Sequence, residues 1–487
     1  MTSSRFLVAP ALALLVLGCP GGGGSGGGTA TFSISGTVSG AVAANVLVSL
    51  SGKETSSTTT NSAGAFSFTG LPSGSYTLRP TLSGYTFTPP SASVTVNGAS
   101  QSGVDFTSSV GPPANVVPIT VNGSLCSSSA YMNEPCVAVT ICSPTTGACQ
   151  TIDGILLDTG SVGLRVFAQL LTVPLTPIAS GTGQLAECLQ FGSFTDWGPV
   201  ETASVVLGGE PAASMPIQVI ESTYASPPSA CASAITDPTT AGFNGILGVN
   251  FFAQDCGVDC ASTVGNGVYY ACTTSGTAAC SEVAAPLANQ VPNPVGLLAT
   301  DNNGVIVQLP VVPPQGLLSA SGTLLLGIGT RSNNVPSGVT KYSVDQFGGF
   351  ETQLGGVQYP GSFLDTGSNG FFFAAPDPSQ LPACTCPTGI PPSECADYTG
   401  WFCPASTLSL TATNIAATGS PSGPVSFSIA NFLALSSSLN VFPDVGGPDP
   451  SASDGFDWGL PFYFGLDVYF GLEGTTSSLG TGPYVAY

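Results

Sequence analysis

The strongest constraint in this sequence is a tetrapeptide that occurs twice, as Asp158-Thr-Gly-Ser161 and as Asp365-Thr-Gly-Ser368. An apolar run precedes each copy, Ile155-Leu-Leu157 in the first case and Phe363-Leu364 in the second. Each run predicts a strand that delivers an aspartate into a tight turn, where glycine lets the backbone bend sharply. The two aspartates are 207 residues apart. This spacing suits two lobes that each present one carboxylate to a shared cleft.

The composition limits the chemistry available to such a cleft. The chain contains no histidine and has a net charge of −21. Nucleophile systems that depend on histidine are therefore excluded, and a phosphate backbone would be repelled, so we expect no nucleic-acid partner. Two carboxyl groups a few ångströms apart cannot easily both ionise, and they share one proton. With a water molecule between them, one acts as general base and the other as general acid, which is sufficient for peptide hydrolysis.

The two turns resemble those of pepsin-like aspartic peptidases. Gly245-Ile-Leu-Gly248 is similar to the motif of two hydrophobic residues and glycine that braces the first catalytic loop in that family, and Asp457-Trp-Gly-Leu-Pro-Phe462 lies where the second lobe's motif would fall. The phrases CQTIDGILLDTGS, FDWGLPFYFG and GTGPYVAY more specifically resemble a bacterial lipoprotein family, domain of unknown function 3443, over almost all of residues 116–487. The resemblance implies a bilobal fold but no established substrate.

The resemblance also assigns roles to individual residues. It makes Asp158 and Asp365 the catalytic dyad, acting without metal or cofactor. The three residues after each aspartate would support the dyad: threonines interlock the two loops, glycines permit the turns, and serines hydrogen-bond the outer carboxylate oxygens. These supporting residues are Thr159, Gly160, Ser161, Thr366, Gly367 and Ser368. The alternative is a fossil dyad that is kept because the interlocked loops hold the lobes together.

Two positions depart from the pepsin pattern. That pattern has a tyrosine on a flap hairpin, hydrogen-bonded to a tryptophan seven residues after the first aspartate. Here Phe191 stands where the tyrosine would be, and Arg165 stands in place of the tryptophan. One interpretation is that Arg165 reaches a carboxylate or a substrate acceptor while Trp197 covers the cleft. The alternative is that Arg165 is solvated and Trp197 belongs to the core.

The N-terminus predicts export and lipid anchoring. Arg5 precedes an apolar run, Phe6 to Leu17, that is too short for a membrane span. The run ends in Val16-Leu-Gly-Cys19, which resembles the bacterial lipobox, so Cys19 is the expected lipidation site; an ordinary signal peptide is the alternative. Pro20 is not the aspartate associated with retention in the inner membrane, so we expect the outer membrane, on its periplasmic or cell-surface side.

Cysteine content agrees with an oxidising compartment. Of the 15 cysteines, 14 remain when Cys19 is set aside, and they fall into even-numbered groups that predict seven mostly local disulfides. The alternative, a zinc site, is weaker because the spacings lack paired CxxC knuckles. The groups are Cys126, Cys136, Cys142 and Cys149; Cys188 and Cys231; Cys256, Cys260, Cys272 and Cys280; Cys384, Cys386, Cys395 and Cys403.

The fold class predicted for the whole chain is mostly β, with an N-terminal β-sandwich followed by a bilobal double-β-barrel domain. The sandwich shows alternating apolar residues between turn clusters, and its stretch from Gly64 to Leu78 resembles a carboxypeptidase-regulatory-like module, which we interpret as a stalk without a ligand. The predicted segments are a signal peptide (1–18), a glycine-rich tether (19–30), the sandwich (31–108), a linker (109–117) and two lobes (118–310 and 311–487).

These features predict a monomeric, lipid-anchored aspartic endopeptidase whose partners are a peptide or protein substrate and, through Cys19, the membrane. The alternative from another class is a noncatalytic envelope lipoprotein of the same fold that binds peptide or polysaccharide.

Overall fold

The computed structural model describes residues 30–82, 84–111, 113–126, 131–273, 279–386, 389, 395–449 and 455–487. The chain divides into two compact units, the first ending at Gly111 and the second extending to Tyr487. The predicted signal peptide, Cys19 and the tether up to residue 29 lie outside the described residues. Within the described part, no helix is long and apolar enough to cross a membrane.

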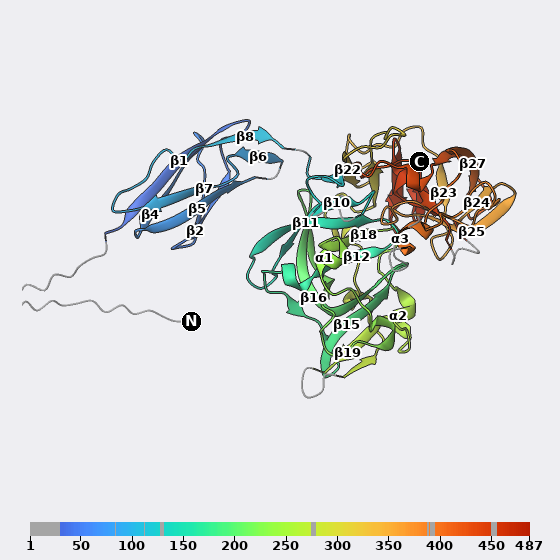
Figure 1. Cartoon of the computed structure of the whole chain (residues 1–487). Coiled ribbons are helices and arrows are strands. Elements are labelled where there is room, and N and C mark those ends of the chain that lie inside the picture. The colour runs from blue at the N-terminus through green and yellow to red at the C-terminus, as the bar shows by residue number, and fades with distance from the viewer. Residues whose placement is uncertain are drawn as a thin grey trace, which may run out of the picture. The chain divides into compact units, whose positions relative to one another are not determined.

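The first unit is a β-sandwich of two four-stranded sheets, in the orders β4-β1-β8-β6 and β3-β2-β5-β7 (Figure 1). Burial alternates along β5, so that Tyr76 and Leu78 face a core that also contains Val48 and Phe106. Its strands are β1 (Phe32–Gly40), β2 (Leu47–Gly52), β3 (Ser56–Thr59), β4 (Ala65–Leu71), β5 (Gly74–Thr81), β6 (Tyr85–Thr88), β7 (Ala92–Val96) and β8 (Phe106–Val110). The predicted sandwich is confirmed.

The second unit is built on a sheet with strands from both of its halves, which we call the central sheet. Its order is β9-β22-β21-β31-β34-β23, and β9 also pairs with β10, the first strand of the first lobe. The pairing of β21 with β22 therefore joins strands from either side of the predicted lobe boundary. The strands are β9 (Val116–Val121), β21 (Gly304–Gln308), β22 (Ala320–Leu326), β23 (Lys341–Ser343), β31 (Asp467–Gly471) and β34 (Tyr484–Ala486).

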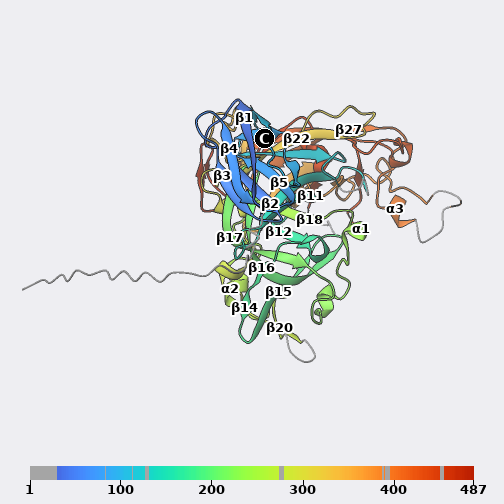
Figure 2. The ribbon, with the colours of Figure 1, turned by 90° about the vertical axis from the view of Figure 1, so that its left-hand side faces the viewer.

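The first lobe comprises β10 to β20 with two short helices. In Figures 1 and 2, β15 and its neighbours extend from this lobe at the lower end of the view, and β15 pairs with β16 and β19. The elements are β10 (Pro135–Cys142), β11 (Cys149–Asp158), β12 (Val162–Phe167), β13 (Thr176–Pro177), β14 (Ala179–Ser180), β15 (Gly183–Gln190), β16 (Thr195–Leu207), β17 (Glu210–Ile220), α1 (Pro238–Ala241), β18 (Gly245–Val249), α2 (Val258–Ser262), β19 (Tyr269–Cys272) and β20 (Cys280–Glu282).

The second lobe is a seven-stranded sheet in the order β28-β27-β24-β25-β30-β26-β29. Its elements are β24 (Phe350–Leu354), β25 (Val357–Leu364), β26 (Phe371–Phe372), α3 (Ala396–Thr399), β27 (Leu408–Ile415), β28 (Ser422–Ile429), β29 (Gly446–Gly447) and β30 (Asp457–Trp458); the short pair β32 (Thr476–Ser477) and β33 (Gly480–Thr481) lies near the C-terminus. The mostly β fold class is confirmed.

Both lobes use the same strand arrangement to hold their Asp-Thr-Gly-Ser turn. In the first lobe, β18 lies parallel to β11 and antiparallel to β12, so it separates the strands before and after the turn. In the second lobe, β30 stands in the same relation to β25 and β26. Each turn is therefore fixed on both sides by a buried strand from later in the chain.

Seven disulfides staple the second unit, and each pairs cysteines within one of the predicted groups. They are Cys126–Cys136, Cys142–Cys149, Cys188–Cys231, Cys256–Cys260, Cys272–Cys280, Cys384–Cys403 and Cys386–Cys395. The predicted number and local character are confirmed, and they indicate an extracellular or periplasmic protein.

Candidate active site

The two turns meet at the interface between the lobes. Asp158 is the last residue of β11, and Asp365 directly follows β25. A Cβ added to Gly160 would lie 2.6 Å from Cγ of Asp365, and one added to Gly367 would lie 2.9 Å from Oδ1 of Asp158. Only glycine leaves room for this approach, so the glycine of each turn packs against the carboxyl group of the other lobe.

The threonines lock the two turns together through four hydrogen bonds. The Thr159 amide donates to Thr366 Oγ1 at 3.0 Å, and the Thr366 amide donates to Thr159 Oγ1 at 2.9 Å. The hydroxyls then donate across the interface, Thr159 to the Leu364 carbonyl at 3.3 Å and Thr366 to the Leu157 carbonyl at 2.7 Å. Both threonines are 0% exposed, so water does not compete for these bonds.

Each carboxyl group is oriented by its own turn. The Gly160 amide donates to Asp158 Oδ1 and the Ser161 hydroxyl to Asp158 Oδ2, at 2.7 and 2.5 Å. The second turn repeats this pattern, because the Gly367 amide and the Ser368 hydroxyl donate to Asp365 Oδ1 and Oδ2 at 2.7 and 2.9 Å. Both aspartates are thus held at one oxygen by backbone and at the other by serine.

The electrostatics of the pair favour a shared proton. Burial raises the pKa of Asp365 well above its ordinary value, and the negative charges of Asp158 and Asp457 and a hydrogen bond with Asp158 raise it further; the Gly367 amide opposes them. The geometry agrees, because a Cβ added to Gly367 would lie 2.9 Å from Asp158 Oδ1 and 3.1 Å from Asp365 Oδ1, so the two carboxyl groups face the same small space. Such a pair holds one proton over a wide pH range.

Three further side chains belong to this region. Tyr463 is fully buried, and its hydroxyl lies 2.8 Å from Thr159 Oγ1. Tyr131 is close enough to the dyad that its pKa is raised, first by burial and then by Glu134, Asp158 and Asp365. Asp457 acts on Asp365 from β30. The sequence placed Tyr463 and Asp457 next to or inside a motif without giving them roles, and no pattern pointed to Tyr131.

The dyad is largely buried but remains accessible to solvent. Asp158 is 5% exposed, and Asp365 is partly exposed. A cavity of about 350 Å³ begins beside Gly160 and is lined mainly by apolar and glycine residues. Phe251, Phe347 and Phe363 contribute its aromatic surface, and Asp345 contributes a carboxyl group. The space next to the first turn is therefore large enough for a side chain of a bound molecule.

Arg165 and Phe191, the two departures from the pepsin pattern, contact each other. Phe191 is at the end of the β15–β16 hairpin, and its ring centroid lies 5.9 Å from Cζ of Arg165, within cation–π range. The Phe191 ring also stacks on Phe194 at 4.6 Å. The hydrogen bond of the pepsin pattern is thus replaced by a contact between a cation and a ring.

Arg165 is 0% exposed, so the interpretation in which it is solvated is wrong. Its Nη2 lies 2.7 Å from Glu187 Oε1 and 3.2 Å from Asp255 Oδ2. Burial alone would lower the pKa of Arg165, but the two carboxylates outweigh it and raise the pKa above its ordinary value. Asp196 lies nearby; neither of its carboxyl oxygens has a hydrogen-bond partner among the described residues, and burial raises its pKa to about 7. We call Arg165, Glu187, Asp196 and Asp255 the buried ionic cluster.

Trp197 belongs to the core of the first lobe. It is 0% exposed and packs with Cys188, Cys231 and Tyr270, and its indole N–H donates to the Tyr224 carbonyl at 2.7 Å. It therefore does not cover the cleft, and the interpretation that gives it this role is wrong.

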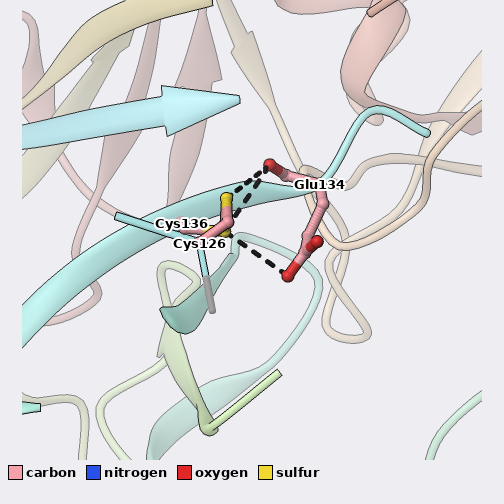
Figure 3. Close-up of side chains that lie close together, drawn as sticks. All are labelled: Cys126, Glu134 and Cys136. Atoms are coloured by element: carbon pink, nitrogen blue, oxygen red, sulfur yellow. Dashed lines mark hydrogen bonds between the residues drawn. A yellow bond between two sulfur atoms is a disulfide. The ribbon is translucent and has the colours of Figure 1, made fainter. Parts of the chain in front are cut away.

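One group of side chains has the composition of a metal site. Cys126, Glu134 and Cys136 lie together in Figure 3, with Glu134 Oε1 3.4 Å from Cys136 Sγ. The two cysteines form a disulfide, so they offer no thiolate to a metal. Burial raises the pKa of Glu134 to about 8, which also disfavours the anion that a metal ligand requires.

Comparisons with known proteins agree with the two-unit organisation. A family model described as "Protein of unknown function (DUF3443)" matches residues 111–487, and a model of the carboxypeptidase regulatory-like domain matches residues 33–109. Among curated proteins, none matches significantly. A solved structure with similarity to this chain is the aspartic proteinase from Irpex lacteus, at 17% identity and a TM-score of 0.42, over 76% of this chain and 96% of that one.

Proposed function

Because the chain belongs to the DUF3443 family, whose function is not known, its activity has to be inferred from its own residues, and we propose an aspartic-type endopeptidase. The observation that carries the proposal is the pair of carboxyl groups at the lobe interface. Asp158 and Asp365 face the same small space at the glycines of the two turns, and each is held at both oxygens by its own turn.

In the proposed reaction, a water molecule lies between the two carboxyl groups. The ionised aspartate takes a proton from this water, which attacks the peptide carbonyl carbon, while the protonated aspartate donates to the carbonyl oxygen. The aspartate that took a proton from the water then gives it to the amine nitrogen as the C–N bond breaks. One hydroxyl of the tetrahedral carbon returns its proton to the other aspartate, so the carbonyl of the new acid forms and the dyad is again singly protonated. The fixed carboxyl groups supply orientation before the substrate binds. No step requires a metal or a cofactor.

The proposal includes a location and partners. The disulfides favour a periplasmic or extracellular setting, and lipidation at Cys19 would anchor the chain in the outer membrane. The sandwich would then act as a stalk that carries the catalytic unit toward peptide or protein substrates. In this proposal the chain acts as a monomer.

The test is cleavage of a diverse peptide mixture by the full-length protein between pH 3 and pH 7. We expect cleavage at acid pH that falls as the shared proton is lost, and a loss of at least about 100-fold in Asp158→Asn and in Asp365→Asn. Asp467→Asn, which removes an exposed carboxylate of β31, is the matched control and should cleave normally.

Equal cleavage by the wild-type protein and both dyad variants would contradict the proposal. Peptide binding without cleavage by the folded wild-type protein would also contradict it, and would support the noncatalytic lipoprotein instead.

A further inference from the structure

The backbone that follows each Asp-Thr-Gly-Ser turn is held at the same position in both lobes. The fourth residue after the aspartate is Val162 in the first lobe and Asn369 in the second. The Val162 carbonyl accepts a hydrogen bond from Nη1 of Arg165 at 2.5 Å. The Asn369 carbonyl accepts one from Nδ2 of Asn133 at 2.9 Å. Arg165 and Asn133 are both 0% exposed, so a buried polar side chain fixes the matching carbonyl in each lobe.

The two side chains that hold these carbonyls come from different parts of the chain. Arg165 lies on β12, three residues after the carbonyl that it holds. Asn133 lies between β9 and β10, 236 residues before Asn369 in the sequence. The bond from Asn133 therefore joins the segment that leads into the first lobe to the backbone of the second turn.

The side-chain amide of Asn133 has a partner for each of its hydrogens. Besides the bond to Asn369, Nδ2 donates to the Phe442 carbonyl at 2.9 Å, and Oδ1 accepts from the Phe442 amide at 2.8 Å. The backbone amide of Asn133 donates to the Asn440 carbonyl at 2.9 Å. An amide side chain offers two donor hydrogens and an acceptor. Asn133 therefore pairs with both backbone groups of Phe442 and still holds the Asn369 carbonyl.

The backbone around Asn133 is itself constrained. Asn133 has a φ of 55°, in the left-handed region that asparagine enters more readily than most residues. The disulfide Cys126–Cys136 closes the segment, and the Glu134 amide donates to Asn122 Oδ1 at 3.1 Å. A backbone conformation of this kind persists where the surrounding structure holds it, and it is common at functional sites. The segment therefore presents Asn133 to the second lobe in a fixed position.

The carbonyl that Asn133 holds is next to the serine that orients Asp365. The Ser368 hydroxyl donates to Asp365 Oδ2 at 2.9 Å, and the Ser368 carbonyl accepts from the Leu460 amide at 2.7 Å. Because the Asn369 carbonyl is fixed as well, two successive peptide groups after the turn have partners that are distant in the sequence. Loss of one partner would let the Ser368 hydroxyl move relative to Asp365.

We propose that Asn133 is a positioning residue, which holds the backbone of the second turn through the Asn369 carbonyl and so keeps Asp365 in place opposite Asp158. Its bonds also tie the segment before the first lobe to the second lobe. Asn133 acts through the turn and does not touch the substrate in this role. The role rests on the proposed peptidase function.

The test compares Asn133 with a second buried asparagine that makes the same set of bonds. Asn303 Nδ2 donates to the Ile328 and Thr476 carbonyls at 3.1 and 3.2 Å, and its Oδ1 accepts from the Ile328 amide at 2.7 Å. Asn303 is 8% exposed and precedes β21 of the central sheet; none of these three bonds reaches an Asp-Thr-Gly-Ser turn. Asn133→Gly removes three side-chain bonds and keeps the left-handed backbone. Asn303→Ala removes the matching three bonds.

The kinetic measurement uses the peptide that the full-length wild-type protein cleaves fastest, at a temperature below the melting temperature of each variant. We expect kcat of Asn133→Gly to fall at least about tenfold and KM to stay within about threefold of wild type, because a misplaced Asp365 affects the reaction more than substrate binding. Asn303→Ala should also lower the melting temperature, but its kcat should stay within about twofold of wild type. Equal losses of kcat in the two variants would overturn the proposal.

A second measurement does not depend on activity. Hydrogen exchange reports the local opening of the backbone. In Asn133→Gly, the amides of residues 365–371 should exchange faster than in wild type, while those of residues 158–164 exchange at the wild-type rate. In Asn303→Ala, both segments should exchange at the wild-type rate. Unchanged exchange of residues 365–371 in Asn133→Gly would show that Asn133 does not hold the second turn.

The two measurements distinguish the failure of each proposal. A wild-type protein that cleaves no peptide at any pH would remove the peptidase function, while hydrogen exchange would still decide whether Asn133 holds the second turn.

A second variant is available if Asn133→Gly does not fold. Asn133→Asp keeps the size of the side chain and an acceptor for the Phe442 amide, but it can donate at most one hydrogen bond. Its kcat should fall at least about threefold, and residues 365–371 should again exchange faster than in wild type. Wild-type values of both quantities in Asn133→Asp would contradict the positioning role.

Discussion

The two lobes hold the same turn with the same strand arrangement, yet different side chains support it: charged groups in the first lobe and aromatic rings in the second. Seven residues after Asp158, the first lobe buries Arg165 in an ionic cluster. Seven residues after Asp365, the second lobe has Phe372, which packs on Trp401 at a centroid distance of 5.5 Å. Beneath the second turn, Phe373, Phe456 and Trp458 form a continuous stack, with centroids 4.4 and 4.1 Å apart.

This difference shows which part of the architecture the turn requires. The interlocking threonines and the glycines are the same in both lobes, so the turn depends on them and on the strand that separates its two sides. The side chains that support this frame can be ionic or aromatic. The consequence is electrostatic: titratable groups support the first turn, whereas the aromatic stack of the second contains none. The contribution of the ionic cluster to stability should therefore depend on pH, and that of the aromatic stack should not.

The largest effect that follows is expected for Arg165→Met. Removal of the guanidinium leaves Glu187 and Asp255 buried without their cation, and breaking a buried pair in this way costs about 3–5 kcal/mol. The loss should be greater at pH 7 than at pH 4, because the carboxyl groups can take up protons at acid pH. Chemical unfolding followed by tryptophan fluorescence measures both values.

The control for that experiment is Lys341→Met, which removes an exposed cation that lies 5.4 Å from the Tyr484 ring centroid. It should cost less than about 1 kcal/mol. Equal destabilisation by the two substitutions would show that the buried ionic cluster contributes no more to the free energy of unfolding than a surface charge does. It would also contradict the contrast drawn between the two lobes.

In the second lobe, Phe456→Leu tests the aromatic stack. Phe456 is 0% exposed and lies between Phe373 and Trp458. The smaller side chain leaves a gap in the stack, and we expect a loss of about 1–3 kcal/mol. Because no titratable group is removed, the loss should be the same at pH 4 and pH 7. A loss that changes with pH in parallel with that of Arg165→Met would contradict the separation of the two supports.

Asp196→Asn tests the pH dependence of the first lobe directly. Burial raises the pKa of Asp196 to about 7 in the folded protein, above the ordinary value of about 3.9. The stability that this group contributes is therefore complete at acid pH and is lost between about pH 4 and pH 7. The asparagine variant avoids this loss and should gain about 3 kcal/mol on the wild-type protein between pH 4.5 and pH 7.5.

The measurement is the unfolding free energy of both proteins at the two pH values. Asp467→Asn, at an exposed position, serves as control and should show no such gain. If the difference between Asp196→Asn and wild type stays constant across this range, Asp196 does not hold a proton in the folded state.

These contrasts also show which features can be predicted from the sequence. The β-rich fold and the repeated turns were predictable because the turns are local patterns with apolar strands before them. The disulfides were predictable in number because their cysteines fall into even groups. Such features depend on neighbours in the chain, which the sequence displays directly.

The contacts of Arg165 and Asp457 depend on the fold instead. Glu187, Asp196 and Asp255 lie 22 to 90 residues from Arg165, and only the strand pairing brings them together. The sequence near an arginine does not show whether its side chain is exposed to solvent or buried in an ionic cluster. Likewise, the sequence pattern predicts Asp457 as part of a bracing motif, whereas its position opposite Phe363 follows from the register of β25 with β30.

The smallest expected effect concerns a hydrogen bond of the Thr159 hydroxyl that the Thr366 hydroxyl does not match among the described residues. Thr159 Oγ1 lies 2.8 Å from the Tyr463 hydroxyl. Because Tyr463→Phe removes one buried hydrogen bond and leaves the ring packing intact, it should cost about 1 kcal/mol. Thr366→Val removes the bond that the Thr366 hydroxyl donates to the Leu157 carbonyl and the bond that it accepts from the Thr159 amide, and it should cost more. If Tyr463→Phe lowers the free energy of unfolding more than Thr366→Val does, the tyrosine supports the dyad more than the interlocked threonines do. The two turns would then be held by different contacts despite their similar sequences.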